Sequence, residues 1–296
     1  MKRHRTRLER REALEAWAFL LPNLIGFLVF TLFPVFASLA LSFANWDILG
    51  TIRFAGMANF VHAATDPLFW RVMINTAYFT FAVVPLQMIL SFAVSLLLNQ
   101  KIGGLSAYRT VYFLPEVCST IAIAAVWVWI YEPDYGLMNE ILRLFGIKGP
   151  QWLRSTTWAM PAVIISQVWR GLGFNIVVIL AGLQGIPQTY YEAAEMDGAS
   201  AWDRIRRITL PLMTPTIFFL VVMGVIRSFQ VFNSIYVMTA GGPGDVTRTL
   251  VYFIYQAAYV WLELGYGSSL AWVLALCLFA VTLVQWRFQK TWVTYD

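Results

Sequence analysis

Long apolar runs alternate with short polar segments along the whole chain, and each run has the length of a membrane-spanning helix. Such a helix needs about 20 apolar residues to cross the hydrocarbon core. Six runs contain either no charged residue or a single one, and they cover residues 16–46, 72–100, 110–131, 155–183, 215–238 and 264–286. The pattern predicts an all-α integral membrane protein of six transmembrane helices, with bends at Pro22 and Pro34 in the first.

The composition supports a membrane protein and excludes several other classes. Hydrophobic residues make up 59% of the chain and charged residues 12%, whereas a soluble domain carries about 25% charged residues. The net charge of +5 does not indicate a nucleic-acid-binding protein, because the basic residues flank apolar runs instead of forming one polar face. His4 and His62 are the two histidines, and no His, Cys or carboxylate cluster has the spacing of a metal site.

The basic residues also predict the orientation of the chain in the membrane. With six spans both termini lie on the same side. Thirteen Lys and Arg residues fall on that side, in 1–15, 99–109, 184–214 and 287–296, and six fall in the opposite loops 45–73, 132–157 and 240–266. Since cytoplasmic loops are enriched in Lys and Arg, we expect both termini in the cytoplasm. We interpret residues 1–296 as one transmembrane domain, with a basic cytoplasmic N-terminus at 1–15.

The cytoplasmic segment 187–212 reads as a helix, a turn and a second helix. Pro187 suits the first turn of a helix, and Gly198 can end that helix in a left-handed conformation. Ser200 and Asp203 have the spacing of a capping box that opens the second helix, and Pro211 is expected to close it. An apolar stripe at helical spacing follows the cap, and it comprises Trp202, Ile205, Ile208 and Leu212.

The same segment contains the string E-A-A-x-x-D-G-A, followed after nine residues by I-x-L-P. This string resembles the cytoplasmic EAA loop of the membrane subunits of binding-protein-dependent ABC importers. Further motifs resemble the maltose and glycerol-phosphate permease branch: Phe19-Leu20-Leu21-Pro22, Phe113-Leu114-Pro115, Ala181-Gly182-Leu183-Gln184-Gly185-Ile186-Pro187 and Thr239-Ala240-Gly241-Gly242-Pro243. By this resemblance the loop is the coupling helix that docks on an ATPase, and its residues are Glu192, Ala193, Ala194, Asp197, Gly198, Ala199, Leu210 and Pro211.

The resemblance implies a type I ABC importer permease in a bacterial plasma membrane. Such a subunit forms half of the pathway for a sugar, oligosaccharide or related polyol that an extracytoplasmic solute-binding protein delivers. The implied partners are a second six-span permease, different from this chain, and two ATPase subunits. The four lysines lie outside any G-x-x-x-x-G-K-S/T motif. We therefore expect no enzyme activity and no cofactor in this chain, with ATP and Mg used by the partner ATPase.

Polar side chains within the fourth and fifth runs are candidates for the solute pathway, because ionisable groups at membrane depth are costly. Gln167, Arg170 and Asn175 cover one band of the fourth helix, with Gly171 and Gly173 expected to loosen it. Arg227, Gln230 and Ser234 are spaced by three and four residues, which predicts one face of the fifth helix. The resemblance implies solute contacts from these stretches, and we assign the pathway to Arg170, Asn175, Arg227, Ser228, Gln230 and Asn233.

Several alternatives remain open at this point. Arg170 and Arg227 could pair with Glu116 or cap backbone carbonyls without touching solute. Two intramembrane arginines also fit an anionic solute, such as a uronate oligosaccharide or a phosphorylated polyol. A secondary transporter or channel for a small polar solute is the main functional alternative. It predicts ion-relay carboxylates within the spans or inverted repeats, whereas Glu116 is the only carboxylate within the six runs and no repeat is visible. A membrane enzyme would need a convergent acid, base or metal set, and the carboxylates are scattered.

Overall fold

A computed structural model describes residues 7–46, 50–100 and 104–293, almost entirely as helices. The one ladder in these ranges pairs β1 (Ala44–Asn45) with β2 (Arg53–Phe54) in antiparallel fashion. The chain divides into two compact units. The first comprises Met1–Ala63 and Gln256–Trp272, and the second comprises Ala64–Tyr255 and Val273–Asp296.

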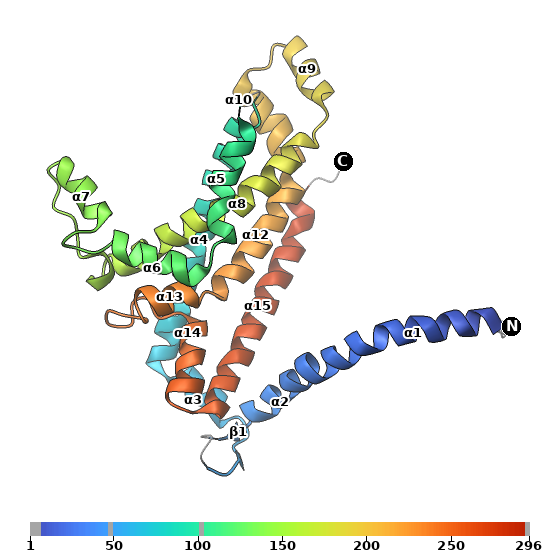
Figure 1. The fold of residues 1–296 in the computed structure, drawn as a ribbon, viewed down its shortest axis with the longest axis vertical. Helices are drawn as coiled ribbons and strands as arrows, with labels where there is room; N and C mark the ends of the chain where they lie inside the picture. Colours follow the sequence, from blue (N-terminus) through green and yellow to red (C-terminus); the bar gives the residue numbers. More distant parts are fainter. Residues whose placement is uncertain (1–6, 47–49, 101–103, 294–296) are drawn as a thin grey trace. The chain divides into compact units, whose positions relative to one another are not determined.

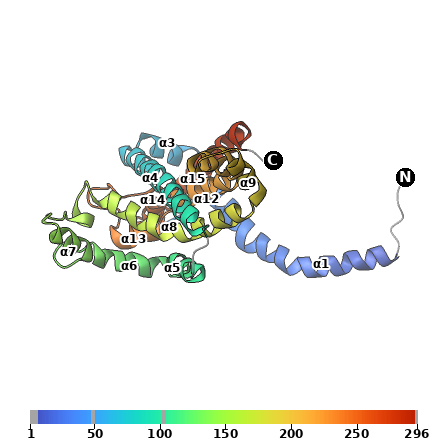
Figure 2. The ribbon, with the colours of Figure 1, turned by 90° about the horizontal axis from the view of Figure 1, so that it is seen from above.

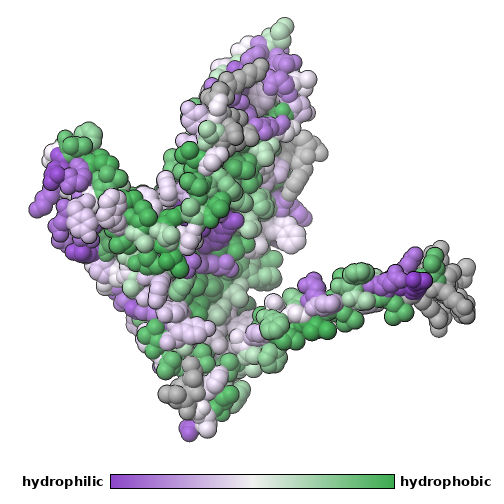
Figure 3. All heavy atoms as spheres, viewed as in Figure 1, coloured by the Kyte–Doolittle hydropathy of each residue, from purple (hydrophilic) through white to green (hydrophobic). Residues whose placement is uncertain are grey.

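The first unit begins with a long apolar helix. α1 (Arg7–Phe27) continues through a π-helical turn (Leu28–Leu32) into α2 (Phe33–Ser42). Its apolar part, Leu14–Ser42, has 29 residues, and none of its most apolar window is buried within the chain; Figure 3 shows the hydrophobic surface that results. Water could not solvate such a surface without a large cost, so it requires lipid or another protein chain.

The prolines of this helix do not interrupt it. Pro22 lies inside α1, and Pro34 follows the π-helical turn directly after Phe33. The amide of Phe33 donates to the carbonyl of Leu28, five residues back. A wider turn gives room for a proline ring next to the preceding turn of the helix. The bend predicted at Pro34 is therefore a local widening of the helix.

Asn59 and Gly265 hold the remainder of the first unit together. Asn59, in α3 (Ala58–Thr65), donates from its amide to the carbonyls of Ser42 and Ala44, both at 3.0 Å. Gly265 opens α15 (Leu264–Trp292), and a Cβ added there would lie 1.9 Å from the Ala44 carbonyl oxygen. The glycine is therefore needed for the close approach of these two backbone segments.

The second unit is built on helices that pack side by side: α4 (Pro67–Leu98), α8 (Ala159–Gln184) and α12 (Thr214–Phe229), as Figures 1 and 2 show. Asp66 caps α4 by accepting from the amide of Leu68 at 2.8 Å. A cluster of buried aromatic and aliphatic side chains, including Phe79, Trp127 and Tyr252, forms a core of this unit. This core fixes α4 and α8 against α6 (Thr120–Ile130) and α13 (Asn233–Met238).

Gly173 allows a close contact between two helices of the second unit. α8 runs unbroken past it, so the loosening expected from Gly171 and Gly173 does not occur. A Cβ at Gly173 would lie 2.2 Å from the carbonyl oxygen of Tyr112 in α5 (Leu105–Val117). Small residues let helix backbones approach closely in membranes, and here they make the α5–α8 crossing possible.

Two of the six apolar runs are not single helices. The third run divides into α5 and α6 (Thr120–Ile130), which meet at an angle of 107°. The fifth run ends as a helix at Phe229, and after Gln230–Phe232 the chain enters α13 (Asn233–Met238). The described residues contain four helices long enough to cross a membrane. The number rises to six if two bent pairs each count as one span, namely Thr110–Val117 with Thr120–Ile130 and Ala201–Leu212 with Thr214–Phe229, the second pair bent by 65°. Six spans thus remain a prediction.

Short helices complete the second unit. α7 (Leu137–Leu144) follows α6, and α14 (Leu250–Tyr255) follows the loop after α13. Between α8 and α12 lie α9 (Gln188–Met196), α10 (Ala201–Arg204), a π-helical turn (Ile205–Thr209) and α11 (Leu210–Leu212). Figure 1 shows α9 and α10 at one end of this unit, with α13 and α14 lying toward its other end.

Candidate functional site

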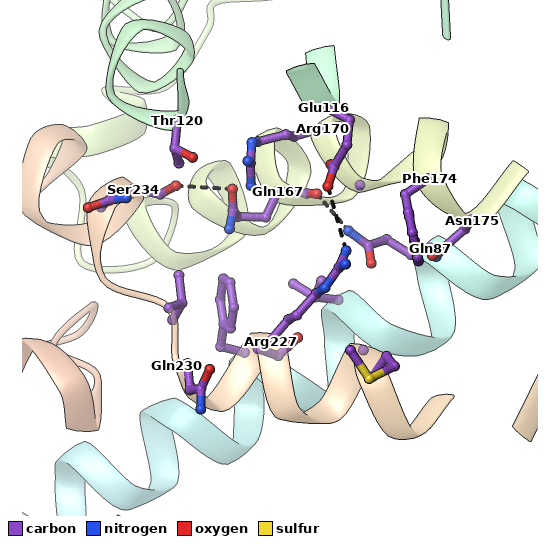
Figure 4. Close-up of a pocket in the computed structure, with 18 of the residues that line it drawn as sticks. Gln87, Glu116, Thr120, Gln167, Arg170, Phe174, Asn175, Arg227, Gln230 and Ser234 are labelled. Atoms are coloured by element: carbon purple, nitrogen blue, oxygen red, sulfur yellow. Dashed lines mark hydrogen bonds and ion pairs between the residues drawn. The ribbon is translucent and has the colours of Figure 1, made fainter. Parts of the chain in front are cut away.

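A polar cavity of about 300 Å³ lies in the second unit, where the two broken runs meet α4 and α8. The α5–α6 bend contributes Glu116 and Thr120, and the α12–α13 break contributes Gln230 and Asn233. Figure 4 shows these elements around the space. The cavity brings together every residue that the sequence assigns to the solute pathway, namely Arg170, Asn175, Arg227, Ser228, Gln230 and Asn233. Their contact with solute remains a prediction.

α8 supplies one wall of the cavity from a single face. Gln167, Arg170 and Asn175 all line the space, as their helical spacing predicts. Gln87 in α4 donates from its side-chain amide to the Gln167 carbonyl at 2.7 Å. Gly171 makes this contact possible, because a Cβ there would lie 2.1 Å from the Gln87 amide nitrogen.

The fifth run lines the cavity differently from the prediction. Arg227 lies in the last turn of α12, Gln230 in the break and Ser234 in the first turn of α13, so the prediction of one helical face is wrong. The backbone at the break finds partners elsewhere, since the Val231 carbonyl accepts from the Thr249 hydroxyl at 3.2 Å. Irregular backbone is tolerated at membrane depth only inside protein or beside a water-filled cavity. The break therefore opens polar groups toward the cavity.

Ser234 and Gln167 bind each other across the cavity wall. The Ser234 hydroxyl donates to the Gln167 side-chain carbonyl at 3.0 Å, as drawn in Figure 4. Ser234 is 3% exposed, so this bond satisfies a buried hydroxyl. The pair joins α8 to α13 at the cavity wall.

Among the described residues, the charged side chains that line the cavity are those of Arg170, Arg227 and Glu116. Arg227 Nη1 lies 3.6 Å from Glu116 Oε1, and its guanidinium lies 4.4 Å from the centre of the Phe174 ring. Arg170 differs, because its buried Nε has no hydrogen-bond partner among the described groups. Of the two pairings with Glu116 considered from the sequence, the one with Arg227 therefore forms, whereas Arg170 has no ion pair among the described residues.

Gln87 and Thr120 are cavity residues that the sequence analysis missed. Gln87 is an amide near the middle of the charge-free second run, which was a usable signal. Thr120 carried no such signal, because its place in the wall depends on the 107° bend between α5 and α6. Nothing in the local sequence of that run predicts an angle of this size.

The loop at 187–212 folds as a helix, a turn and a second helix. Gly198 has φ +76° and ends α9, as predicted. The amide of Ala199 donates to the carbonyl of Ala194 at 2.9 Å, and the amide of Gly198 donates to the carbonyl of Glu195 at 3.0 Å. This pair of bonds is a Schellman motif, and it fixes the direction in which the chain leaves α9.

The predicted cap of the second helix is present. The Ser200 hydroxyl accepts from the amide of Asp203 at 3.2 Å and donates to its carboxylate. That bond to the charged form lowers the pKa of Asp203 below its ordinary value, and the positive charges of Arg207 and Arg206 act in the same direction. At neutral pH the carboxylate is therefore ionised and holds the start of α10.

The second helix ends close to the predicted residue. It runs through α11 and ends at Leu212, one residue beyond Pro211, and the chain then bends by 65° into α12. A π-helical turn precedes this proline at the same distance as in the first unit, and the amide of Leu210 donates to the Ile205 carbonyl. Of the predicted apolar stripe, Ile205, Ile208 and Leu212 are half-buried, whereas Trp202 is 66% exposed.

Side-chain contacts connect α9 to the second helix. Tyr191 and Thr209 share a hydrogen bond of 3.0 Å between their hydroxyls, and Glu195 forms an ion pair with Arg204. Sequence spacing alone could not predict either contact. The opposite side of the loop is left exposed, including Met196 at 89%. The motif residues Glu192, Ala193, Asp197 and Gly198 are exposed, whereas Ala194, Ala199, Leu210 and Pro211 are half-buried.

Comparison with known proteins gives this arrangement a family. The sequence model of the "binding-protein-dependent transport system inner membrane component" family matches residues 67–291, which include the whole cavity and the loop. The chain belongs to this family. As an inner-membrane component it is a multi-pass membrane protein, and the resemblance inferred from the EAA string is confirmed at the level of the family.

Curated relatives of this permease cover nearly its full length. The probable ABC transporter permease protein YesP of Bacillus subtilis is 35% identical, over 99% of this chain and 96% of its own. The trehalose/maltose transport system permease protein MalF of Thermococcus litoralis is 34% identical, over 96% and 98%. The chain is thus similar to permease subunits of ABC sugar transporters.

Solved structures show the same fold. One permease chain of a bacterial alginate ABC transporter, solved with a periplasmic protein bound to alginate pentasaccharide, superposes with a TM-score of 0.84. It is 24% identical and the match covers 97% of this chain and 98% of that one. At this identity the likeness establishes a type I ABC importer permease fold, and it says nothing of this chain's solute.

Proposed function

We propose that this permease forms half of the translocation pathway of an ATP-driven importer for a sugar, oligosaccharide or related polyol. A solute-binding protein delivers the solute at the extracytoplasmic face, and two ATPase subunits drive alternating access. A second six-span permease, different from this chain, provides the other half. The chain lies in a bacterial inner membrane with both termini on the cytoplasmic side, and it binds no cofactor itself. ATP and Mg act on the ATPase subunits.

The observation that carries this proposal is the polar cavity at the meeting point of two broken helices. Unwound segments of membrane helices occur where they line a solute or ion site, because their free backbone groups need polar partners. The walls present amides and hydroxyls, including Gln87, Asn175 and Asn233, which can replace water on the hydroxyl groups of a sugar.

The loop supports the second part of the proposal, the transmission of force from the ATPase. Its EAA residues stand on a helix whose end is fixed by Gly198 and whose side is tied to the next helix by Tyr191 and Glu195. The second helix leads through Met213 into α12, which ends at the cavity. Movement of the loop by an ATPase would therefore act on the cavity wall through two helices in direct succession, Ala201–Leu212 and Thr214–Phe229, which meet at an angle of 65°.

The names of the relatives leave the solute undecided. Relatives are named for trehalose and maltose, for lactose, for arabinooligosaccharides and for sn-glycerol-3-phosphate. One solved relative imports the acidic polysaccharide alginate. These solutes include neutral and charged molecules, so the charge of the solute has to be inferred from the cavity.

Co-purification tests the proposal. The tagged chain is extracted from its native membrane in mild detergent, and every chain that accompanies it is identified. We expect an ATPase, a second six-span permease and ATP hydrolysis that increases when the solute-loaded binding protein is added. Recovery of this chain alone, from membranes in which it is abundant and folded, would contradict the proposal and favour a channel or secondary transporter.

A further inference from the structure

The charges in the cavity contain an asymmetry that points to the chemistry of the solute. Arg227 has two sources of compensation, since Glu116 lies 3.6 Å away and the Phe174 ring lies 4.4 Å below its guanidinium. Arg170 has neither, and its Nε is buried without a hydrogen-bond partner among the described groups. A cation at membrane depth costs about 2.5–3.5 kcal/mol even on permissive scales. A cavity that retains such a group without a partner is complementary to an anion.

The nature of Arg170 narrows the choice of anion. A guanidinium presents its donors as a planar fork that matches a carboxylate, with two parallel hydrogen bonds. The charged groups of the cavity sum to +1, because Glu116 offsets one of the two arginines. A single carboxylate would neutralise this charge, whereas a phosphate at neutral pH carries about −1.5 to −2. The charge balance therefore favours a carboxylate over a phosphate.

The remaining walls suit a hydroxylated ring. Gln87 from α4, Asn175 from α8 and Gln230 from the break present amide groups, and Thr120 presents a hydroxyl, as Figure 4 shows. These neutral groups can both donate and accept hydrogen bonds, as sugar hydroxyls require. Apolar surface from Phe232 lies in the same cavity.

We propose that the cavity selects a sugar that carries one carboxylate, a uronic acid unit, with Arg170 as the residue that binds the carboxylate. Glu116 then serves as a positioning residue: it holds Arg227 and keeps the net charge of the cavity at +1. This inference rests on the proposed function, because it assumes that the cavity lies on the pathway of a solute.

Direct binding to the assembled transporter tests the inference. The permease pair with its ATPase subunits is purified without the binding protein, and its assembly and ATP hydrolysis are measured first. Binding of galacturonate and of galactose, which differ only in the carboxylate, is then measured by saturation-transfer difference NMR. We expect galacturonate to bind at least about tenfold more tightly, the size expected of a hydrogen-bonded charge pair.

Variants of the arginine separate charge from shape. Arg170→Gln should reduce the preference for galacturonate to about one while changing galactose binding less than about threefold. Arg170→Lys should give an intermediate preference, because it keeps the charge and loses the fork. Glu116→Gln, which raises the cavity charge to +2, should tighten galacturonate binding. Arg154→Gln is the matched control, since this exposed arginine pairs with Glu132 outside the cavity and should leave the preference unchanged.

Two kinds of failure can be told apart. A complex that assembles and hydrolyses ATP, but binds galacturonate no more tightly than galactose or not at all, overturns this inference and leaves the proposed function standing. The same holds if Arg170→Gln weakens both sugars equally. A chain that does not assemble with any ATPase contradicts the proposed function itself, and this inference fails with it.

Discussion

Replacing Gly198 in the coupling loop should separate ATP hydrolysis from transport. Its φ of +76° lies in the left-handed region, and a Cβ added there would meet nothing within 4 Å. The cost of Gly198→Ala therefore comes from the backbone alone, about 1–2 kcal/mol. A cost of this size shifts the local equilibrium away from the Schellman motif by a factor of roughly 5–30. The EAA helix would then lose its fixed orientation without any change in the spans.

The assay is the number of ATP molecules hydrolysed for each solute transported in proteoliposomes, with hydrogen exchange over residues 196–204 as a structural readout. Gly198→Ala should raise both the number of ATP molecules hydrolysed per solute and the rate of hydrogen exchange over residues 196–204. Gly198→Pro should raise them further, because it also removes the amide that donates to Glu195 and forbids a positive φ. Gly198→Asn should have a smaller effect, since Asn tolerates the left-handed region.

Gly146 provides a matched control for this experiment. It has φ +71° after α7, and a Cβ there would also meet nothing within 4 Å. Gly146→Ala carries the same backbone cost at a place remote in sequence from the loop, so coupling should be unchanged. If Gly198→Ala keeps the normal ratio of hydrolysis to transport while exchange in the loop increases, the assignment of this loop to coupling is wrong.

Two further predictions concern local structure. Ser200→Ala should increase hydrogen exchange over 201–204 by about fivefold at pH 7. Because the pKa of Asp203 is lowered, the stabilisation by the cap is fully present above the ordinary Asp pKa of about 3.9 and is lost as the pH falls through the lowered value. Hydrogen exchange over 201–204 that does not respond to acid would refute this assignment. Gly173→Ala should lower the thermal stability of the purified chain in detergent, because its Cβ would lie 2.2 Å from the Tyr112 carbonyl oxygen. Gly26→Ala, with nothing within 4 Å, is the control and should be neutral or slightly stabilising; equal effects of the two substitutions would argue against the close α5–α8 crossing.

Local chemistry predicted the parts of the structure that depend on a few neighbouring residues. The left-handed end of α9 at Gly198 and the cap by Ser200 follow from the conformational freedom of glycine and from the reach of a serine hydroxyl. The positions of four long helices follow from apolar length alone. The polar side chains of the fourth run were placed on one face because α8 is a regular helix over its whole length.

The breaks in the helices could not be predicted from the same information. Hydropathy reports how long a segment stays apolar, and it does not report whether the helix within the segment is continuous. The break after Phe229 is stabilised by Thr249, which lies on a different element of the chain. Likewise, the π-helical turn at Ile205–Thr209 that precedes Pro211 was not expected from the sequence. At the break after Phe229 the tertiary structure overrides the local helix preference.

The proposed function requires an ATPase subunit to dock on the exposed face of the coupling loop, residues 187–212. The most direct measurement places a photo-crosslinking amino acid at Ala193, which is exposed on α9, and identifies the crosslinked chains in native membranes. The account predicts a crosslink to a subunit that carries a nucleotide-binding motif, and a yield that changes when ATP is added. Crosslinks only to lipid, or to this chain itself, in membranes where the protein is folded and abundant would contradict it.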